Sequence, residues 1–293
     1  MATLTRRKEN PERTQGARSH IMMKLLDKIL QQAQPNLAGQ TIRDGVVGLH
    51  FVGVQLDTGN CHFVTLMREA LDNLDQAYGL EMLGKPATEI AQWVQTGEND
   101  LQRALGMAAL NAASPYYPRP RSGKYPLPQV DNQQDDGVPL VRPGDTVGMI
   151  GLMTPSVRQL QPLVKKIIVF DRALEQQIQD EGFASSFGEN VRLYPMRLQA
   201  ELLPACDVVL ITGTTMINHT LEQILSFCPH AREILLKGFS LAYYPQAYQH
   251  TAITAISSVY FEPDSAALFR PLSLGGGWNE VMRYAHHCCT RLR

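Results

Sequence analysis

The sequence predicts an α/β protein in which a smaller α+β domain precedes a Rossmann-like C-terminal domain. Two observations support this prediction. Short apolar runs alternate with helical segments in the second half of the chain, which is typical of a parallel sheet with helical crossovers. A stretch rich in Pro, Gln, Asp and Gly, from Ser114 to Gly137, separates this half from a first half with a different pattern.

The domain boundaries follow from these changes of pattern. The first 22 residues are polar and rich in arginine, so we expect a disordered leader or a cloning remnant, with Met22 or Met23 as the native start. The expected division is 1–22 for the leader, 23–114 for the α+β domain, 115–139 for a linker and 140–293 for the Rossmann-like domain.

The N-terminal domain should begin with a helix and continue with a β-hairpin. Apolar residues at helical spacing predict a helix over 23–32. The segments 41–56 and 61–67 are rich in β-branched residues and flank a turn at Asp57–Asn60, which predicts that they pair.

The remaining elements are two helices and a series of strands. The helices are expected to start at Pro86 and near Asn99. After residue 140, helices separate most of the strands, which implies parallel pairing and right-handed crossovers. The expected strands are 146–150, 166–170, 191–194, 208–212 and 233–236.

The composition argues against two classes of protein. A formal net charge of −1 with no basic stripe argues against nucleic-acid binding, and no apolar run is long enough to cross a membrane. Five cysteines without framework spacing indicate reduced thiols, and no secretory signal is visible, so we expect a cytoplasmic protein. The expected partners are small-molecule or metal ligands, and a homo-oligomer is left open.

The segment Asp207–Thr220 predicts a ligand site. A buried strand runs into a Gly-Thr-Thr turn, and a helix is expected to open at 218–220. Such a junction places free backbone N–H groups at the carboxyl edge of a sheet, where open α/β folds bind anions. The alternative is plain capping of the helix by a threonine of the turn. The candidate residues are Thr214, Thr215, Asn218 and Thr220.

A second candidate position follows the strand 146–150. Gly151 lies at its end, and Thr154 is expected to cap the next helix, with Pro155 as its first residue. Asp171 follows the next strand, about 20 residues after Gly151, an interval at which an acid can meet a ribose hydroxyl. Asp171 could instead cap the helix after it, and the run lacks the three-glycine dinucleotide fingerprint.

Lys237 and Ser240 end the fifth expected strand and could face the same crevice. Lys237 could neutralise an anionic ligand, and Ser240 could donate a hydrogen bond to it. The alternative is a solvated lysine before a turn at Gly238.

The run His286-His287-Cys288-Cys289 suggests metal binding. If 278–292 is helical, Cys288 faces the core, and only His286 and Cys289 could chelate a metal ion together. Two ligands do not complete a structural zinc site. His286 and Cys289 are therefore metal candidates without a full ligand set.

The combined pattern resembles the family described as "Putative heavy-metal chelation". The most specific parts are "LGMAALNA", which contains Asn111, and "ITGTTMINHTLEQIL", which begins at Ile211. The resemblance extends from about Leu25 to about Arg293. The other matching elements are Gly84–Ala87, Asn99–Asn111, Gly148–Gly151, the "VFD" that ends at Asp171, and the turn Lys237–Ser240.

The resemblance implies an enolase N-terminal-like domain joined to the Rossmann-like domain, with a ligand cleft between them. It also implies that Asn111 faces Thr214, Thr215, Asn218 and Thr220 across this cleft; from its sequence position alone, Asn111 would be a C-terminal helix cap. One departure is Phe239, which stands where a Gly-Pro-Ser type of turn is expected.

The leading functional prediction is binding of a metal ion, or of a metal-bearing or anionic small molecule, in the interdomain cleft. One alternative is an enzyme of the methyltransferase or dehydrogenase type that uses a nucleoside-containing cofactor at Gly151 and Asp171. Another is a ligand sensor or assembly partner without catalysis. The cofactor candidates are a transition-metal ion and a nucleoside-type compound, and no catalytic base is identified.

Overall fold

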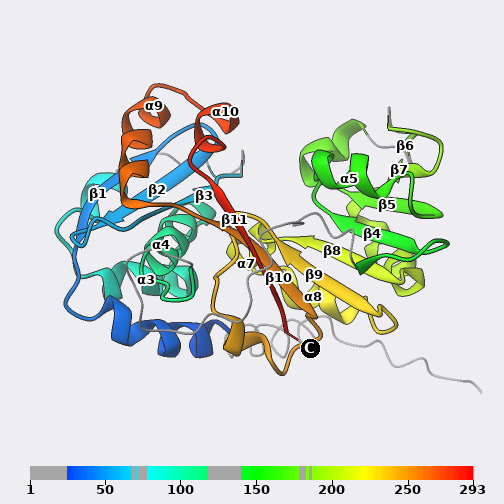
Figure 1. Ribbon diagram of the computed structural model, residues 1–293, viewed down its shortest axis with the longest axis horizontal. Helices are drawn as coiled ribbons and strands as arrows, with labels where there is room; N and C mark the ends of the chain where they lie inside the picture. Colours follow the sequence, from blue (N-terminus) through cyan, green and yellow to red (C-terminus); the bar gives the residue numbers. More distant parts are fainter. Residues whose placement is uncertain are drawn as a thin grey trace, which may run out of the picture.

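A computed structural model of the protein describes residues 25–67, 70, 78–117, 140–177, 183–184 and 187–292. The expected leader and most of the expected linker lie outside these residues. The fold is mixed α/β, with a small antiparallel sheet and a large, mostly parallel one (Figure 1). Strands β10 and β11 of the large sheet run between the small sheet and the strands β4 to β7.

The small sheet is a meander of three antiparallel strands, β1 Ile42–Val47, β2 Phe51–Leu56 and β3 Cys61–Thr65. The predicted hairpin is confirmed as the β2–β3 pair. The segment expected to be one strand, 41–56, is two strands instead. Gly48 lies in the turn between them, and a side chain there would collide with the carbonyl oxygen of Leu272, only 2.8 Å from the position of its Cβ.

Helices pack against the small sheet. Residues 25–37 are helical, so the predicted first helix is present and extends further. The helix opened by Pro86 is α3, Ala87–Thr96, and the next is α4, which begins after its cap residue Asn99, as predicted. The side chain of Asn99 accepts a hydrogen bond from the N–H of Gln102. Helix α4 extends over Asp100–Ala112. A further short helix, α2, Tyr78–Glu81, precedes α3 in the chain.

The large sheet has eight strands in the order β11-β10-β9-β8-β4-β5-β7-β6. The six in the middle are parallel, and the two outer strands are antiparallel to their neighbours. All five predicted strands are present. The bounds are β4 Thr146–Ile150, β5 Lys166–Phe170, β6 Phe183–Ala184, β7 Val191–Leu193, β8 Val208–Thr212, β9 Glu233–Lys237, β10 Ala255–Tyr260 and β11 His286–Arg291.

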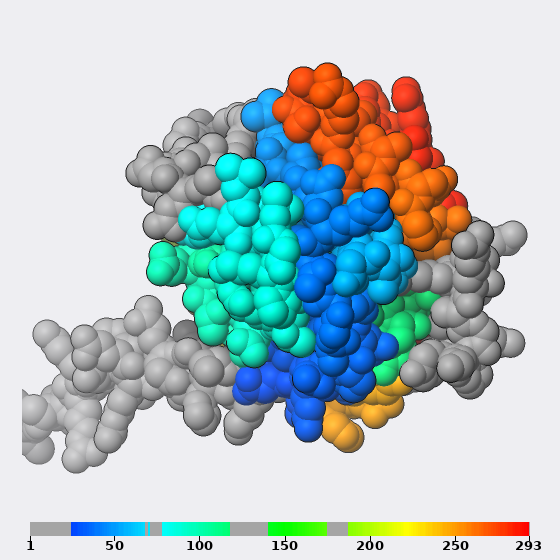
Figure 2. All heavy atoms as spheres, turned by 90° about the vertical axis from the view of Figure 1, so that its left-hand side faces the viewer, coloured from blue at the N-terminus to red at the C-terminus, as the bar shows by residue number. Residues whose placement is uncertain are grey.

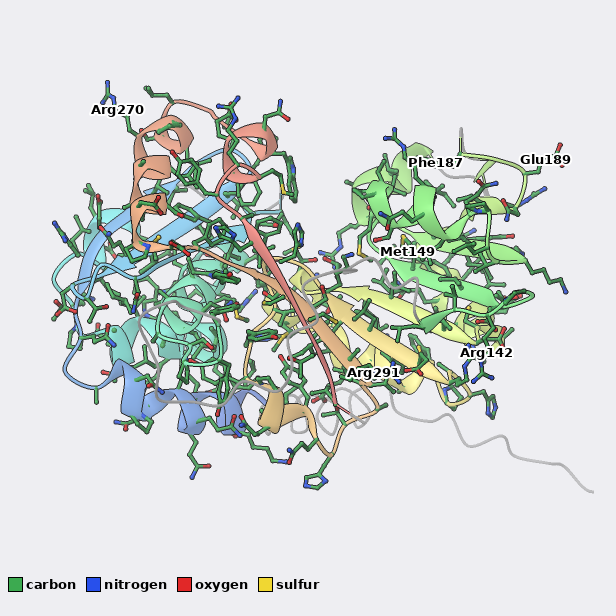
Figure 3. The ribbon with its side chains drawn as sticks, in the orientation of Figure 1. Arg142, Met149, Phe187, Glu189, Arg270 and Arg291 are labelled. Carbon is green, nitrogen blue, oxygen red and sulfur yellow. The ribbon has the colours of Figure 1, made fainter. Side chains whose placement is uncertain are left out.

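The strand order reverses between β4 and β8. From β4 the chain moves outward to β5 and β7, then returns to β8 and continues outward to β9 and β10 on the other side. The carboxyl ends at such a reversal are where open α/β sheets bind ligands. Figure 3 shows Arg142, which precedes β4, at the outer side of the molecule and Met149 nearer the middle, so that β4 points toward the small sheet.

The last segment of the chain is not the predicted long helix. Only α10, Trp278–Val281, is helical, and β11 then pairs antiparallel with β10. Neither β10 nor β11 was predicted. Burial in β11 alternates, with Cys288 and Thr290 buried between more exposed residues, which is the period of a strand. The pairing with β10 therefore overrides the helical spacing seen in the sequence.

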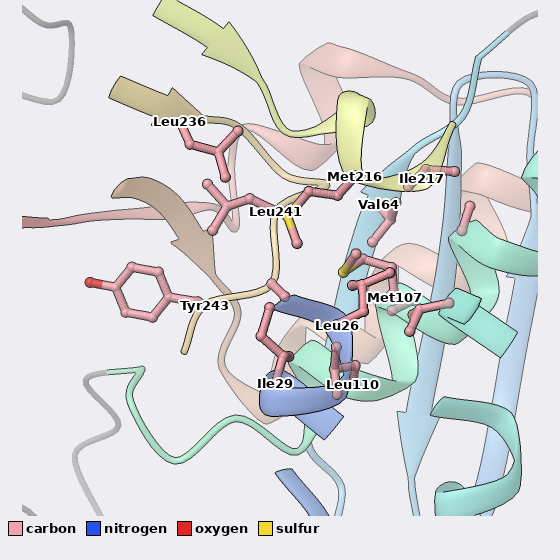
Figure 4. Close-up of a cluster of buried hydrophobic side chains, with 14 of the residues drawn as sticks. Leu26, Ile29, Val64, Met107, Leu110, Met216, Ile217, Leu236, Leu241 and Tyr243 are labelled. Atoms are coloured by element: carbon pink, nitrogen blue, oxygen red, sulfur yellow. The ribbon is translucent and has the colours of Figure 1, made fainter. Parts of the chain in front are cut away.

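The two faces of the large sheet have different coverings. On one face, Val157 and Leu160 of α5, Thr154–Leu160, pack against a cluster that includes Val147, Met149 and Leu210. On the other face, one cluster of buried side chains continues from the sheet into the N-terminal elements. Figure 4 shows this cluster, which we call the shared core, with Leu26, Ile29, Val64, Met107, Leu110, Met216, Ile217, Leu236 and Leu241.

Short helices complete the fold. Helix α9 packs against β1, and Figure 2 shows it, in orange, beside the blue N-terminal strands. None of the helices among the described residues has the length and apolar character needed to cross a membrane. The remaining helices are α6 Gln199–Leu202, α7 Thr214–Ile217, α8 Leu221–Ser226 and α9 Phe269–Ser273.

Candidate functional site

A row of polar side chains crosses the carboxyl edge of the large sheet. Thr212 of β8 pairs with Lys237 of β9, Lys237 pairs with Ser257 of β10, and Ser257 pairs with Cys289 of β11. Residues paired in this way project from the same face of a sheet. Leu210, Leu235 and Ala255 lie two residues earlier in β8, β9 and β10, so they project from the same face. They belong to the cluster that packs under α5, which shows that α5 covers this face. We call these four residues the edge row.

Gly151 lies beside the edge row. Its φ of +82° is in the left-handed region, which favours glycine. A Cβ built on Gly151 would lie 3.0 Å from Cγ2 of Thr212, so a larger residue would press on the neighbouring strand. Gly151 therefore lies against Thr212, the last residue of the strand before Thr214.

Asp171, at the end of β5, fixes the loop that follows β4. Its Oδ2 accepts a hydrogen bond from the N–H of Leu152 at 2.7 Å, and its Oδ1 accepts one from the N–H of Ala173 at 2.9 Å. The second bond is the one expected if Asp171 caps the helix after it. That helix, Arg172–Gln177, is of the 3-10 type. Both carboxylate oxygens are thus engaged with the backbone, and a ribose-binding role for Asp171 stays a prediction.

Lys237 reaches across β8 to the helix that follows β4. Its Nζ donates a hydrogen bond to Oγ of Ser156 at 3.3 Å. Thr154 is the first residue of α5 and not its cap; Met153 takes the cap position without a side-chain bond. The structure therefore brings the amino group of Lys237 to the first turn of α5, which begins at Thr154, and pairs Lys237 with Thr212, the neighbour of Gly151.

Ser257 is a member of the edge row that sequence reasoning missed. Its side chain is fully buried, and its hydroxyl has no hydrogen-bond partner among the described residues. A buried hydroxyl without a partner costs about 1–3 kcal/mol. No sequence pattern identified Ser257, because β10 was not predicted; the register of β10 with β9 is what places it beside Lys237.

Asn111 belongs to the contact between the N-terminal elements and the large sheet. It is fully buried within α4, so it is not the expected helix cap, which is Ala113. Its Nδ2 donates to the carbonyl of Leu241 at 2.7 Å, and its Oδ1 accepts from the N–H of Tyr243 at 3.0 Å. Asn111 thus holds the segment after β9 against α4.

Ser240 and Thr215 also make internal hydrogen bonds. Both are buried: Ser240 donates to the carbonyl of Thr65 in β3, and Thr215 donates to the carbonyl of Thr212 at 2.7 Å. The helix expected to open at 218–220 is present as α8, which starts at Leu221 after its cap residue Thr220. A separate short helix, α7, was not expected and already starts at Thr214. Its cap residue is Gly213, without a side-chain bond, so neither threonine has the predicted capping role.

Asn218 and Thr220 lie in the break between α7 and α8. Oδ1 of Asn218 accepts hydrogen bonds from the N–H and the hydroxyl of Thr220, at 3.2 and 2.7 Å. His219, between them, has a φ of 57° and forms a hydrogen bond from Nε2 to the carbonyl of Val94 in α3. The break between α7 and α8 is therefore attached to the N-terminal helices. Thr214 lies nearer to the edge row, because its hydroxyl is 3.2 Å from that of Thr212.

The metal candidates His286 and Cys289 lie on β11. In a strand, residues three apart project from opposite faces, so the chelating geometry expected from a helix is lost. The ring of His286 stacks on Tyr260, whereas Cys289 belongs to the edge row. The prediction that Cys288 is part of the core is confirmed.

Phe239, the departure from the expected turn, has a packing role. Its ring contacts Phe51 of β2 at a centroid distance of 5.4 Å and Trp278 of α10 at 5.4 Å. The turn after β9 is thus joined to both the small sheet and α10 by aromatic contacts, which proline in its place would not supply.

The described residues do not assemble a protein-only metal site. Within them, no group of three or more His, Cys, Asp or Glu side chains is placed to hold a metal ion. Tetrahedral zinc sites in proteins take three or four such ligands. The donor set at the edge row, an ammonium group, hydroxyls and one thiol, suits an anion rather than a bare cation.

Comparison with known proteins gives two family matches and one curated relative. A family model, DUF364, described as "Putative heavy-metal chelation", matches residues 138–288, and a second with the same description, DUF4213, matches residues 30–114. An uncharacterized protein of Methanocaldococcus jannaschii is 30% identical over 172 residues. That match covers 58% of this chain and 59% of the relative, which is less than two thirds of the relative's length.

Two crystal structures are similar in fold. Both are proteins of unknown function from the DUF364 family. The one from Pyrococcus horikoshii has a TM-score of 0.68 and 21% identity, and the match covers 91% of this chain and 99% of that chain. The one from Desulfitobacterium hafniense has a TM-score of 0.67 and 19% identity, with 92% and 98% covered.

Proposed function

Because this chain belongs to the DUF364 family, described as "Putative heavy-metal chelation", we propose that it binds an anionic small molecule, including one that carries a metal ion. The proposed site is the carboxyl edge of the large sheet where the strand order reverses. One observation carries the proposal: Lys237 extends along this edge and reaches Ser156 in the helix after β4.

The chemistry of this edge favours an anion. Lysine provides a compact positive charge that interacts with anionic groups of varied shape. The hydroxyl of Ser156 lies 3.3 Å from Nζ of Lys237, Thr212 is the partner of Lys237 in β8, and the hydroxyl of Thr214 lies 3.2 Å from that of Thr212. These hydroxyls can donate to anion oxygens. The backbone of Gly151 has no side chain to keep a ligand away from Thr212.

The donor set does not suit a bare metal ion as the ligand. Ammonium groups are not metal ligands, and hydroxyls bind soft metals weakly. A metal would therefore arrive as part of a larger, anionic compound. This form of the proposal agrees with the description of the family and with the residues at the edge.

The proposal is tested by calorimetric titration with inorganic pyrophosphate at low and at moderate salt. We expect the wild type to bind, and Lys237→Met to bind about tenfold more weakly, which corresponds to about 1.4 kcal/mol. The loss should shrink as salt rises, because the lysine acts through its charge. Lys165→Met, a change at an exposed lysine that precedes β5, is the matched control and should bind like the wild type.

Two results would contradict the proposal. One is that the wild type does not bind pyrophosphate at all. The other is that Lys237→Met and Lys165→Met bind it with the same affinity as the wild type, which would place the anion elsewhere on the molecule.

A further inference from the structure

The edge row continues beyond Lys237 onto β10 and β11, which the anion site proposed above does not use. Ser257 is paired with Lys237 on one side and with Cys289 on the other. Neighbouring strands are about 4.8 Å apart, so the backbones at Lys237 and Cys289 are about 10 Å apart, with Ser257 between them. A small polyanionic compound has the length to contact all three side chains.

Ser257 gives independent evidence of a missing partner. Its hydroxyl is buried on the face of the edge row and has no hydrogen-bond partner among the described residues. Buried polar groups in native proteins are nearly always paired, and an exception calls for an explanation. A ligand oxygen held by Lys237 would accept a hydrogen bond from this hydroxyl.

Cys289 adds a different kind of donor. The other four cysteines are buried, whereas Cys289 is only partly buried. Thiolate sulfur binds soft metal ions such as Zn²⁺ and Cd²⁺ in preference to hard ones. One thiolate supplies one ligand, and among the described residues Cys289 belongs to no group of three or more His, Cys, Asp or Glu side chains that could hold a metal ion. A metal ion at Cys289 must therefore bring most of its ligands with it.

We propose that the ligand is an anionic chelate of a thiophilic metal ion. Its anionic oxygens bind Lys237 and the hydroxyl of Ser257, and its metal takes Sγ of Cys289 as an additional ligand. On binding, the thiol of Cys289 releases its proton to solvent, and the sulfur replaces a water molecule on the metal. This inference rests on the anion site proposed above and names the class of compound that the site takes.

The test uses the complex of Cd²⁺ with nitrilotriacetate, which has a net negative charge and leaves positions open on the metal. Untagged full-length protein is titrated with this complex, with Cd²⁺ alone and with nitrilotriacetate alone. We expect the complex to bind more tightly than either component. We also expect an ultraviolet absorption band from charge transfer between thiolate and Cd²⁺, with release of one proton per site.

Three variants assign the contacts. Cys289→Ser should lose the absorption band. Cys228→Ser is the control and should keep the band, because Cys228 lies in the shared core. Serine can also make the hydrogen bond of Cys228 to the carbonyl of Ile224. Ser257→Ala should weaken binding of the complex several-fold. Its melting temperature should not fall, because the change removes a hydroxyl that lacks a partner.

The outcomes separate this inference from the proposed function. If pyrophosphate binds in a Lys237-dependent way but the absorption band is absent or survives in Cys289→Ser, the metal assignment is wrong and the anion site remains. If Ser257→Ala binds the complex like the wild type, Ser257 is not a contact. If neither pyrophosphate nor the complex binds, both proposals fail.

Discussion

Single residues near the carboxyl edge of the large sheet fall into two groups that differ in what they contact. Lys237, Gly151 and Cys289 are placed along the carboxyl edge of the large sheet. Asn111 and Ser240 instead bond to backbone groups across the contact between the N-terminal elements and the sheet. Residue type alone could not separate the groups, because asparagine and serine serve equally well in sites and in structural contacts.

Asn111 provides a test of this division. Replacing it with alanine leaves the buried carbonyl of Leu241 and the N–H of Tyr243 without their partner. We expect Asn111→Ala to lower the free energy of unfolding by about 2–4 kcal/mol, measured by chemical denaturation. The affinity of the folded protein for pyrophosphate should stay within twofold of the wild type. A large loss of affinity with unchanged stability would instead place Asn111 in the ligand site.

At the scale of elements, sequence patterns predicted the central strands because these are short apolar runs buried on both faces. The sequence patterns failed for β10 and β11, where strand pairing determines the secondary structure. Strand β11 contains residues that also suit a helix, and β10 includes three polar or small residues in six positions. The edge row could therefore not be predicted, because Ser257 and Cys289 join it only through the registers of β10 and β11.

The break between α7 and α8 gives a second prediction. His219 has a positive φ, a backbone conformation that is unfavourable for residues other than glycine. Its ring also forms a hydrogen bond to the carbonyl of Val94. His219→Ala and His219→Gly both lose this bond, but only glycine relieves the backbone strain. We expect the glycine variant to be more stable than the alanine variant by about 1 kcal/mol in thermal or chemical unfolding. The reverse order would show that the left-handed backbone is absent in solution.

An ion pair at the opposite edge of the sheet predicts a pH dependence. Asp145, before β4, pairs with Arg232, before β9, at 2.7 Å. Burial acts to raise the pKa of Asp145, but hydrogen bonds from Arg232 and Arg142, with their charges, outweigh it, so the pKa lies below its usual value. The stabilisation is therefore complete above the unfolded-state pKa of about 3.9 and is lost as the pH falls through the lower folded-state pKa.

Asp145→Asn removes this dependence. We expect the variant to be less stable than the wild type at neutral pH, with the difference shrinking as the pH falls below about 4. Urea unfolding across this pH range is the measurement. A difference that stays constant or grows toward acid pH would mean that the carboxylate is not held in its charged form by Arg232.

At the scale of the whole molecule, the shared core joins parts of the chain that the sequence assigned to separate domains. Side chains of the helix over 25–37 and of α4 pack in one cluster with residues of α7, β9 and the segment after β9. The change of pattern near residue 115 was a sound basis for predicting two kinds of sheet, and both are present. It carried no information about how much apolar surface the two parts bury together.

This packing predicts the behaviour of the cleaved protein. The composition of residues 118–139, which lie outside the described residues, favours early proteolytic cleavage there. Because the shared core spans both sides of this segment, the two fragments should elute together in size-exclusion chromatography and separate only in denaturant. Fragments that separate without denaturant and stay folded would show that the shared core contributes little.

An anion that binds at the carboxyl edge of the large sheet, beside Lys237, should be visible there in a crystal. The most direct measurement is a crystal structure of the protein grown with pyrophosphate. We expect a bound anion within hydrogen-bond distance of Nζ of Lys237, next to Thr212 and the backbone of Gly151. Two results would contradict this expectation. One is an anion bound among Asn111, Ser240 and Asn218. The other is no anion at the edge at pyrophosphate concentrations that saturate the protein in solution.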